Sequence, residues 1–233
     1  MNSFQFFGPA HLCILAAVPL LAALLTFIQW RLPAGSKILR ISLGTILLLD
    51  SAAYYSTLAA NGQLSDPDHL PLQLCDASLC LVIVALFTLN KFVYDLAYYG
   101  ALAGATMALL TPNVTGPFPS LWTVQFFIDH GLIVAGALYL VWSGQARPSK
   151  GSVLRAMLWL NIYAAFVGTI DWIFKTNYMY LRAKPQNGSL LNFLGPWPWY
   201  ILAAEGVALV VFGLLYLPFR PTASMPRPQT ENP

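Results

Sequence analysis

Charge is scarce in this sequence. Asp, Glu, Lys and Arg make up only 9% of the 233 residues, whereas 58% are hydrophobic. A soluble domain carries roughly a quarter of its residues as charged side chains, so this composition excludes an ordinary soluble protein and favours an integral membrane protein. The formal net charge of +3 is also too small and too scattered to indicate a nucleic-acid-binding surface.

Several recognisable patterns are also missing. The chain has only three cysteines, all in apolar stretches, which gives no sign of a disulfide framework. There are no heptads, internal repeats or glycine-rich phosphate loops. The N-terminus lacks the basic region and small-residue cleavage site of a signal peptide, so we expect the first apolar segment to be retained.

Long apolar runs dominate what is present. A helix needs about 20 mainly apolar residues to cross a bilayer, and seven stretches meet this requirement. We therefore predict an all-α bundle of seven transmembrane helices that forms one domain over residues 1–217. Residues 218–233, with five prolines and no apolar period, predict a disordered cytoplasmic tail. The seven predicted spans are residues 10–30, 37–59, 69–89, 92–110, 121–142, 153–175 and 197–217.

The basic residues predict how the bundle is oriented. If the N-terminus is outside, nine of the 12 Lys and Arg residues fall in cytoplasmic connections, and the other three are Lys175, Arg182 and Lys184. Cytoplasmic loops carry such an excess in most membrane proteins. We therefore expect the N-terminus outside and the C-terminus in the cytoplasm. In the fourth span, Gly100 and Gly104 have the spacing that lets helices approach closely, and we interpret it as packing within the bundle.

Polar groups inside these spans are the main functional signal, because ionisable residues in membrane helices are rare and usually functional. At a rise of about 1.5 Å per residue, the acids fall in the outer half of the membrane, except Asp95 at an interfacial helix end. Cys75 lies roughly 9 Å below the outer end of its predicted helix. We expect these polar groups to form one buried polar chamber. The ionisable groups are Asp50, Asp76, Asp129, His130, Asp171 and Glu205.

Two of these positions suggest covalent catalysis. Cys75 and His130 each adjoin a carboxyl group, and both lie toward the outer side. An imidazole can take the proton of a thiol, and the thiolate can then attack an ester carbonyl. A carboxylate behind the histidine would fix its tautomer, and spacing alone does not decide which one. The candidate supporting acids are Asp76, Asp129, Asp171, Asp50 and Glu205; candidate oxyanion or substrate donors are Gln73, Asn177 and Tyr178.

Each group also has a structural interpretation. A buried carboxyl can simply hydrogen-bond a neighbour, and a lone membrane histidine is often structural. Cysteine is a common small apolar filler, which is how we interpret Cys13 and Cys80. What favours chemistry at Cys75 and His130 is the company of acids on the same side of the membrane. An ester substrate in that leaflet would be a lipid.

Four motifs give the chain a resemblance to known proteins. It resembles the YwaF-like family of bacterial integral-membrane proteins and is similar to their vertebrate relative, an ether-phospholipid acyltransferase of the endoplasmic reticulum. The resemblance extends from about Phe7 to Leu217. The motifs are LPLQLCD at residues 70–76, FIDHG at 127–131, NYMYLR at 177–182 and LGPWPWY at 194–200.

The resemblance implies a cysteine nucleophile and a histidine partner, which match Cys75 and His130. It also implies CoA-independent transfer of an acyl chain from a phospholipid to a lysophospholipid, with no cofactor. Gln73 stands where bacterial members more often have histidine. The corresponding location is a bacterial inner membrane, with the site toward the periplasmic leaflet.

Three other functions remain open at this point. The same Cys-His couple could act as a lipid hydrolase with water as the acceptor. The buried acids could serve a proton-coupled transporter, although they stop halfway across the membrane. A zinc hydrolase would need three protein ligands, for which only His11, His69 and His130 are available as histidines; we expect no metal.

Overall fold

A computed structural model describes residues 4–114, 118–185 and 189–220. Every regular element in these ranges is helical and none is a strand, which confirms the all-α prediction. Most of the predicted tail, residues 221–233, lies outside the described residues; its first two residues belong to the short turn η6 (Leu217–Phe219). The α-helices are α1 (Pro9–Arg31), α2 (Ser36–Ala60), α3 (Leu74–Thr88), α4 (Lys91–Tyr99), α5 (Thr106–Leu110), α6 (Leu121–Trp142), α7 (Ser152–Phe174) and α8 (Trp199–Tyr216).

Five helices of the described chain are long and apolar enough to cross a membrane: α1, α2, α6, α7 and α8. The protein is therefore an integral membrane protein. The 15 residues of α3 cover only about 22 Å at 1.5 Å per residue, less than the roughly 30 Å of a hydrocarbon core. The fourth span is divided by a π-helical stretch, η3 (Gly100–Ala105), between α4 and α5. Seven crossings and a single domain therefore stay predictions.

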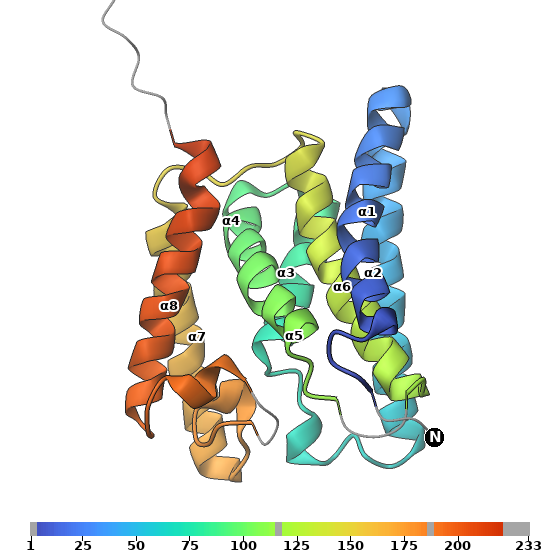
Figure 1. Cartoon of the computed structure of the whole chain (residues 1–233). Helices are drawn as coiled ribbons and strands as arrows, with labels where there is room; N and C mark the ends of the chain where they lie inside the picture. Colours follow the sequence, from blue (N-terminus) through green and yellow to red (C-terminus); the bar gives the residue numbers. More distant parts are fainter. Residues whose placement is uncertain (1–3, 115–117, 186–188, 221–233) are drawn as a thin grey trace, which may run out of the picture.

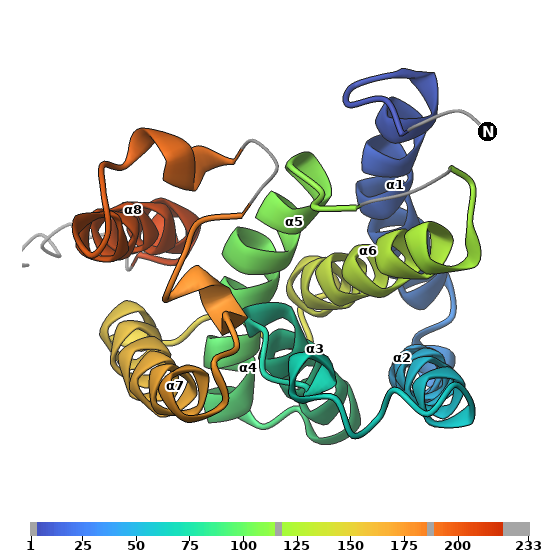
Figure 2. The same cartoon turned by 90° about the horizontal axis from the view of Figure 1, so that it is seen from below.

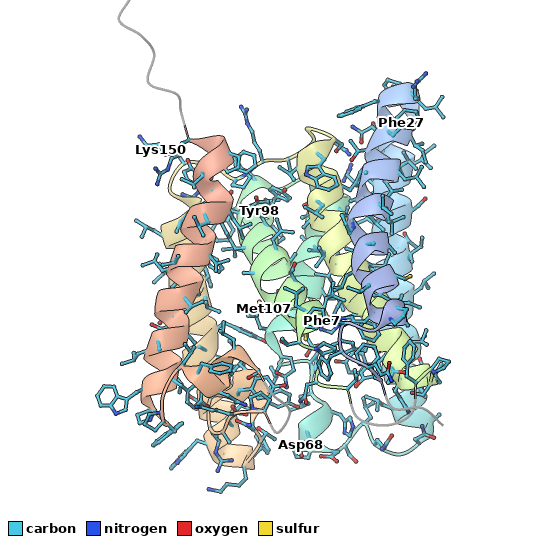
Figure 3. All side chains as sticks on the ribbon, viewed as in Figure 1. Phe7, Phe27, Asp68, Tyr98, Met107 and Lys150 are labelled. Atoms are coloured by element: carbon cyan, nitrogen blue, oxygen red, sulfur yellow. The ribbon has the colours of Figure 1, made fainter. Side chains whose placement is uncertain are left out.

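The two ends of the bundle are readily distinguished. The described chain starts at one end, and α8 finishes at the other (Figure 1). Figure 3 places Asp68 at the first end and Phe27 and Lys150 at the opposite one. We call the first the outer end and the second the inner end, following the predicted orientation, which itself stays a prediction.

The third span differs from its prediction at its start. A helix was expected from residue 69, but Pro67–His69 form a short 3₁₀ turn, η2, and α3 begins only at Leu74. The residue before a proline is held in extended backbone, and Leu70, which precedes Pro71, has φ −68° and ψ 146°. Gln73 then caps the helix, with its backbone N–H donating to Asp76 Oδ2 at 2.9 Å. Cys75 therefore lies in the first turn of α3 rather than well below its start.

Glycines let the fourth span lie closely against α3. A Cβ atom on Gly100 would come 2.5 Å from Ser78 Oγ, and one on Gly104 would come 3.2 Å from Leu74 Cδ2. Both glycines lie in η3, which packs directly on α3. The glycine spacing thus serves packing inside the bundle, as the sequence suggests.

Helices α7 and α8 form a pair beside the rest of the bundle. Figure 2 shows them together on one side of α4 and α5, away from α1, α2 and α6. At the inner end they are tied to α4: the Tyr99 hydroxyl lies 2.8 Å from Ser152 Oγ, and the Tyr98 hydroxyl donates to Leu215 O at 3.1 Å. The Tyr99 and Phe212 rings stack there with centroids 4.7 Å apart.

An ion pair reinforces this inner contact. Asp95 on α4 is buried, and its carboxylate accepts from Arg155 at 2.6 Å and from the Ser149 backbone N–H at 2.8 Å. Arg155 lies in the first turn of α7 and Ser149 in the connection before it. The α7–α8 pair is therefore fixed to α4 by charge as well as by aromatic packing.

Candidate functional site

A cavity of about 1130 Å³ separates the α7–α8 pair from α3 and the fourth span, and at its outer part it reaches α2 and α6. This exceeds the roughly 300–1,000 Å³ of ordinary small-molecule pockets. Asp68 and Met107 both line it, and Figure 3 shows Asp68 at the outer end with Met107 farther in. Six of the predicted site residues line the cavity, namely Gln73, Cys75, Asp76, Asp129, His130 and Tyr178.

Cys75 faces this cavity from the start of α3 and is partly buried. The first backbone N–H groups of a helix have no partner inside it, and they place partial positive charge at its N-terminus. These N–H groups can donate to an oxyanion that forms beside the sulfur. The neighbouring Asp76 carboxylate is bonded to the Gln73 N–H, so it acts as a helix cap.

His130 on α6 is held in one orientation. Its Nδ1 lies 2.8 Å from Phe126 O, and because a carbonyl oxygen can only accept, Nδ1 carries the proton. In the neutral ring, Nε2 then has the free lone pair. The ring also stacks on Phe126, with centroids 4.2 Å apart and planes inclined at 29°. Asp129 Oδ2 is 3.7 Å from Nδ1, too far for a hydrogen bond, so a backbone carbonyl orients this histidine.

Two further predicted acids, Asp129 on α6 and Asp50 on α2, belong to this part of the structure. Gln125 Nε2 donates to Asp50 Oδ2 at 3.2 Å, which links α6 to α2. Gln125 and Asp129 line the cavity, whereas Asp50 does not. Within the described chain, Asp129 Oδ1 is buried without a hydrogen-bond partner.

Three other predicted site residues, Asp171, Asn177 and Glu205, do not line the cavity. Asp171 is buried, and its Oδ1 accepts from Thr176 Oγ1 at 2.7 Å and from the Tyr178 N–H at 2.8 Å, which orders the chain after α7. Both ends of the Asn177 amide are occupied by backbone groups of residues 182 and 183. Neither of them lines the cavity, and Glu205 on α8 does not line it either.

Tyr178 connects the two sides of the cavity at its outer end. Its hydroxyl donates to Pro67 O and accepts from the Leu70 N–H at 2.7 Å. Burial raises the pKa of Tyr178 to about 12. The next residue, Met179, donates its N–H to Gln73 Oε1 at 2.9 Å. The chain after α7 is thus fastened to the segment that leads into Cys75, and the Gln73 Nε2 amide remains as a donor beside it.

Gln125 and Phe126 were not among the predicted site residues. Both precede the Asp129–His130 pair by four positions on the same helix, so each lies on the same face as one member of the pair. That spacing was a usable signal for Gln125. The role of Phe126 was not predictable in this way, because it acts through its backbone carbonyl as well as its ring.

Comparison with known proteins gives one match. A family model described as the TMEM164 family matches residues 6–216. No curated protein matches, and no solved structure matches.

Proposed function

The chain belongs to the TMEM164 family, the family of an ether-lipid acyltransferase, and from this premise we propose that it is a membrane-embedded phospholipid acyltransferase. It moves an acyl chain from a phospholipid to a lysophospholipid without CoA, through a thioester on Cys75 and with His130 as the base. Its affiliation to the bacterial YwaF-like group and its location in a bacterial inner membrane remain predictions.

One observation carries the proposal. Cys75 and His130 come from different helices and line the same lipid-sized cavity, and the Nδ1 proton of His130 is already committed to Phe126 O. Its Nε2 is therefore the nitrogen that accepts a proton. Cys75 lies in the first turn of α3 beside the Asp76 carboxylate, which disfavours a free thiolate, so the thiol needs a base such as His130 to ionise.

The first half-reaction follows from these groups. His130 Nε2 takes the proton from the Cys75 thiol, and the sulfur attacks the ester carbonyl of a donor phospholipid. The carbonyl becomes a tetrahedral oxyanion, for which the first-turn N–H groups of α3 and the Gln73 amide are the nearby donors. When the C–O bond breaks, the lysophospholipid oxygen takes the proton back from His130, and the acyl group stays on sulfur as a thioester.

The second half-reaction reverses these steps. The hydroxyl of an acceptor lysophospholipid gives its proton to His130 Nε2 and attacks the thioester carbonyl. Collapse of the intermediate breaks the C–S bond, and the sulfur recovers the proton. Water in place of the acceptor would release a free fatty acid, which makes hydrolysis the second candidate on the same residues.

The other candidate functions find less support. A transporter would need polar groups continuing to the inner end, but Asp95, the acid there, is occupied by Arg155 and Ser149 and does not line the cavity. Among the described residues, no three His, Cys, Asp or Glu side chains come together as metal ligands. Both ring nitrogens of His11 are bonded, to the Phe7 N–H and to Leu109 O.

The proposal is tested by looking for the thioester. Purified protein in nanodiscs is incubated with a donor phospholipid, and its intact mass is measured before and after hydroxylamine. We expect a hydroxylamine-labile acyl group on wild type and on the matched control Cys80→Ser, and none on Cys75→Ser. Wild type that never carries such a group, together with full lipid activity in Cys75→Ser, would refute the mechanism.

A second measurement addresses His130. In a background with Cys13 and Cys80 replaced by serine, the rate of iodoacetamide alkylation reports the thiolate fraction of Cys75. We expect His130→Asn to slow alkylation by at least tenfold, whereas Asp129→Asn should leave the rate within a fewfold of the parent. Equal alkylation rates in the parent and in His130→Asn would show that His130 does not act as the base for Cys75.

A further inference from the structure

The cavity continues inward past the polar groups along one face of α8. Ala204, Ala208, Val211 and Phe212 line it, and their spacing of four, seven and eight residues keeps them on one side of a helix. Leu209 and Val210 lie on the other side and are 46% and 62% exposed, as expected for lipid-facing positions. We call the part of the cavity along this α8 face the inner arm.

The inner arm has a narrow end. The stacked Tyr99 and Phe212 rings line it, and the Tyr99 hydroxyl is held by Ser152. Tyr99 is 0% exposed and Phe212 5% exposed. Figure 3 shows neighbouring Tyr98 toward the inner end, beyond Met107 on the cavity wall. The Tyr99–Phe212 pair therefore narrows the cavity toward the inner end of the bundle, where Leu96 and Ala156 also line it.

The two parts of the cavity differ in chemistry. All of its ionisable acidic and histidine lining residues lie on η2, α3 and α6, and no Lys, Arg or Glu of the described chain lines it. The inner arm is walled instead by aliphatic and aromatic side chains, with small residues on α8. From Ala204 to Phe212 the arm extends about 12 Å, at 1.5 Å per residue. Such walls suit a hydrocarbon chain better than a polar head group.

We propose that the inner arm holds the acyl chain under transfer and that the Tyr99–Phe212 pair sets the longest chain that fits. This inference rests on the proposed acyltransferase function and adds the determinant of its acyl specificity. A chain that leaves the bilayer for this arm exchanges one hydrocarbon environment for another, so hydrophobic transfer gives little selection. Selection comes from steric overlap with the narrow end. The chain-length profile should therefore fall abruptly above one length instead of declining gradually.

The test changes the depth of the arm in both directions. Ala208→Phe fills it, Phe212→Ala opens its end, and Val210→Phe adds the same ring on the lipid-facing side of α8 as the matched control. Rates are measured in nanodiscs with donor phosphatidylcholines of graded acyl-chain length. We expect Ala208→Phe to lower the longest accepted chain, with a loss of roughly 5- to 150-fold for chains above it, the range that corresponds to overpacking a core. Phe212→Ala should accept longer chains, and Val210→Phe should keep the wild-type profile.

A binding measurement separates this inference from the proposed chemistry. In the Cys75→Ala variant, a phosphatidylcholine carrying a diazirine at the end of one acyl chain is photolysed, and the labelled peptides are identified by mass spectrometry. We expect labels on α8 near Phe212 and on α4 near Tyr99, reduced at least fivefold by Ala208→Phe. Labelling there without any transfer by wild type would sustain the chain site and refute the acyltransferase. Transfer by wild type with identical profiles in Ala208→Phe and Val210→Phe, and no label on α8, would overturn the inference.

Discussion

Tyr178→Phe removes one hydroxyl and weakens the contact between the outer ends of the two halves of the bundle, where the bond from Met179 N–H to Gln73 remains. The phenol ring lines the cavity and is only 3% exposed. Its hydroxyl is the group that joins the chain after α7 to Pro67 and Leu70, just ahead of α3. The inner contacts of the α7–α8 pair are unaffected, so the substitution tests the outer fastening alone.

The expected cost follows from the two bonds that are lost. Replacing the tyrosine leaves the Leu70 N–H and the Pro67 C=O without this partner, and because both residues are exposed, water replaces it. Each lost hydrogen bond then costs about 0.5–1.5 kcal/mol, or about 1–3 kcal/mol for the two. The ring itself stays, so packing changes little. At about 2–4 °C per kcal/mol for a chain of this size, the melting temperature should fall by roughly 2–12 °C. The acyl-transfer rate should fall as well, because the chain before Cys75 becomes less ordered.

Thermal unfolding in nanodiscs gives the stability change, and amide hydrogen exchange at residues 67–72 gives its location. Tyr55→Phe is the matched control, since the Tyr55 hydroxyl has no hydrogen bond within the described residues. We expect exchange at Leu70 to rise at least tenfold in Tyr178→Phe and to stay at the wild-type rate in the control. Equal melting temperatures and equal exchange in the two variants would show that the Tyr178 hydroxyl does not hold the two segments together.

Three more predictions concern stability. Asp95→Asn weakens the ion pair between α4 and α7, and because the arginine is partly exposed the loss should be about 1–3 kcal/mol in thermal unfolding. Gly100→Ala places a methyl group 2.5 Å from Ser78 Oγ and should cost about 1–3 kcal/mol, whereas Gly206→Ala, with nothing within 4 Å, should be neutral or slightly stabilising. Since burial raises the pKa of Tyr178 from 10.0 to about 12, its contribution should be complete below about pH 10 and decline as the pH rises toward 12. Other tyrosines titrate in the same range, so alkaline melting curves of Tyr178→Phe should show a smaller decline than those of wild type.

Hydropathy predicted most of the helical architecture because polar loops separate the apolar runs. The predicted and observed bounds of α6 coincide at residues 121 and 142. Hydropathy failed at the start of α3, where Leu70, Leu72 and Leu74 continue the apolar run although Pro71 prevents a helix. It also gave no sign of the π-helical stretch in the fourth span, which changes backbone hydrogen bonding without changing composition.

The candidate site was predictable in part. That Cys75 and His130 share a cavity could be expected from the clustering of polar groups toward one side of the membrane. The partner of the His130 Nδ1 could not, because a backbone carbonyl has no signature in the sequence. The positions of Asp171 and Asn177 outside the cavity lining were not predictable for a related reason. Their partners are backbone groups of the connection after α7, and the hydrogen bonds of a loop depend on its conformation rather than on residue spacing.

The late start of α3 changes the chemical surroundings of Cys75. A helix starting at residue 69 would place the thiol about a turn and a half inside it, where the backbone N–H groups are already bonded. The helix is short, however, and its 15 residues cover about 22 Å of a hydrocarbon core of roughly 30 Å. If the inner end of α3 is level with those of its neighbours, its N-terminus still lies about 8 Å below the outer boundary. Cys75 therefore lies beside the first-turn N–H groups of α3, which can hold the oxyanion of a tetrahedral intermediate. A helix that starts at residue 69 would use those N–H groups in its own hydrogen bonds.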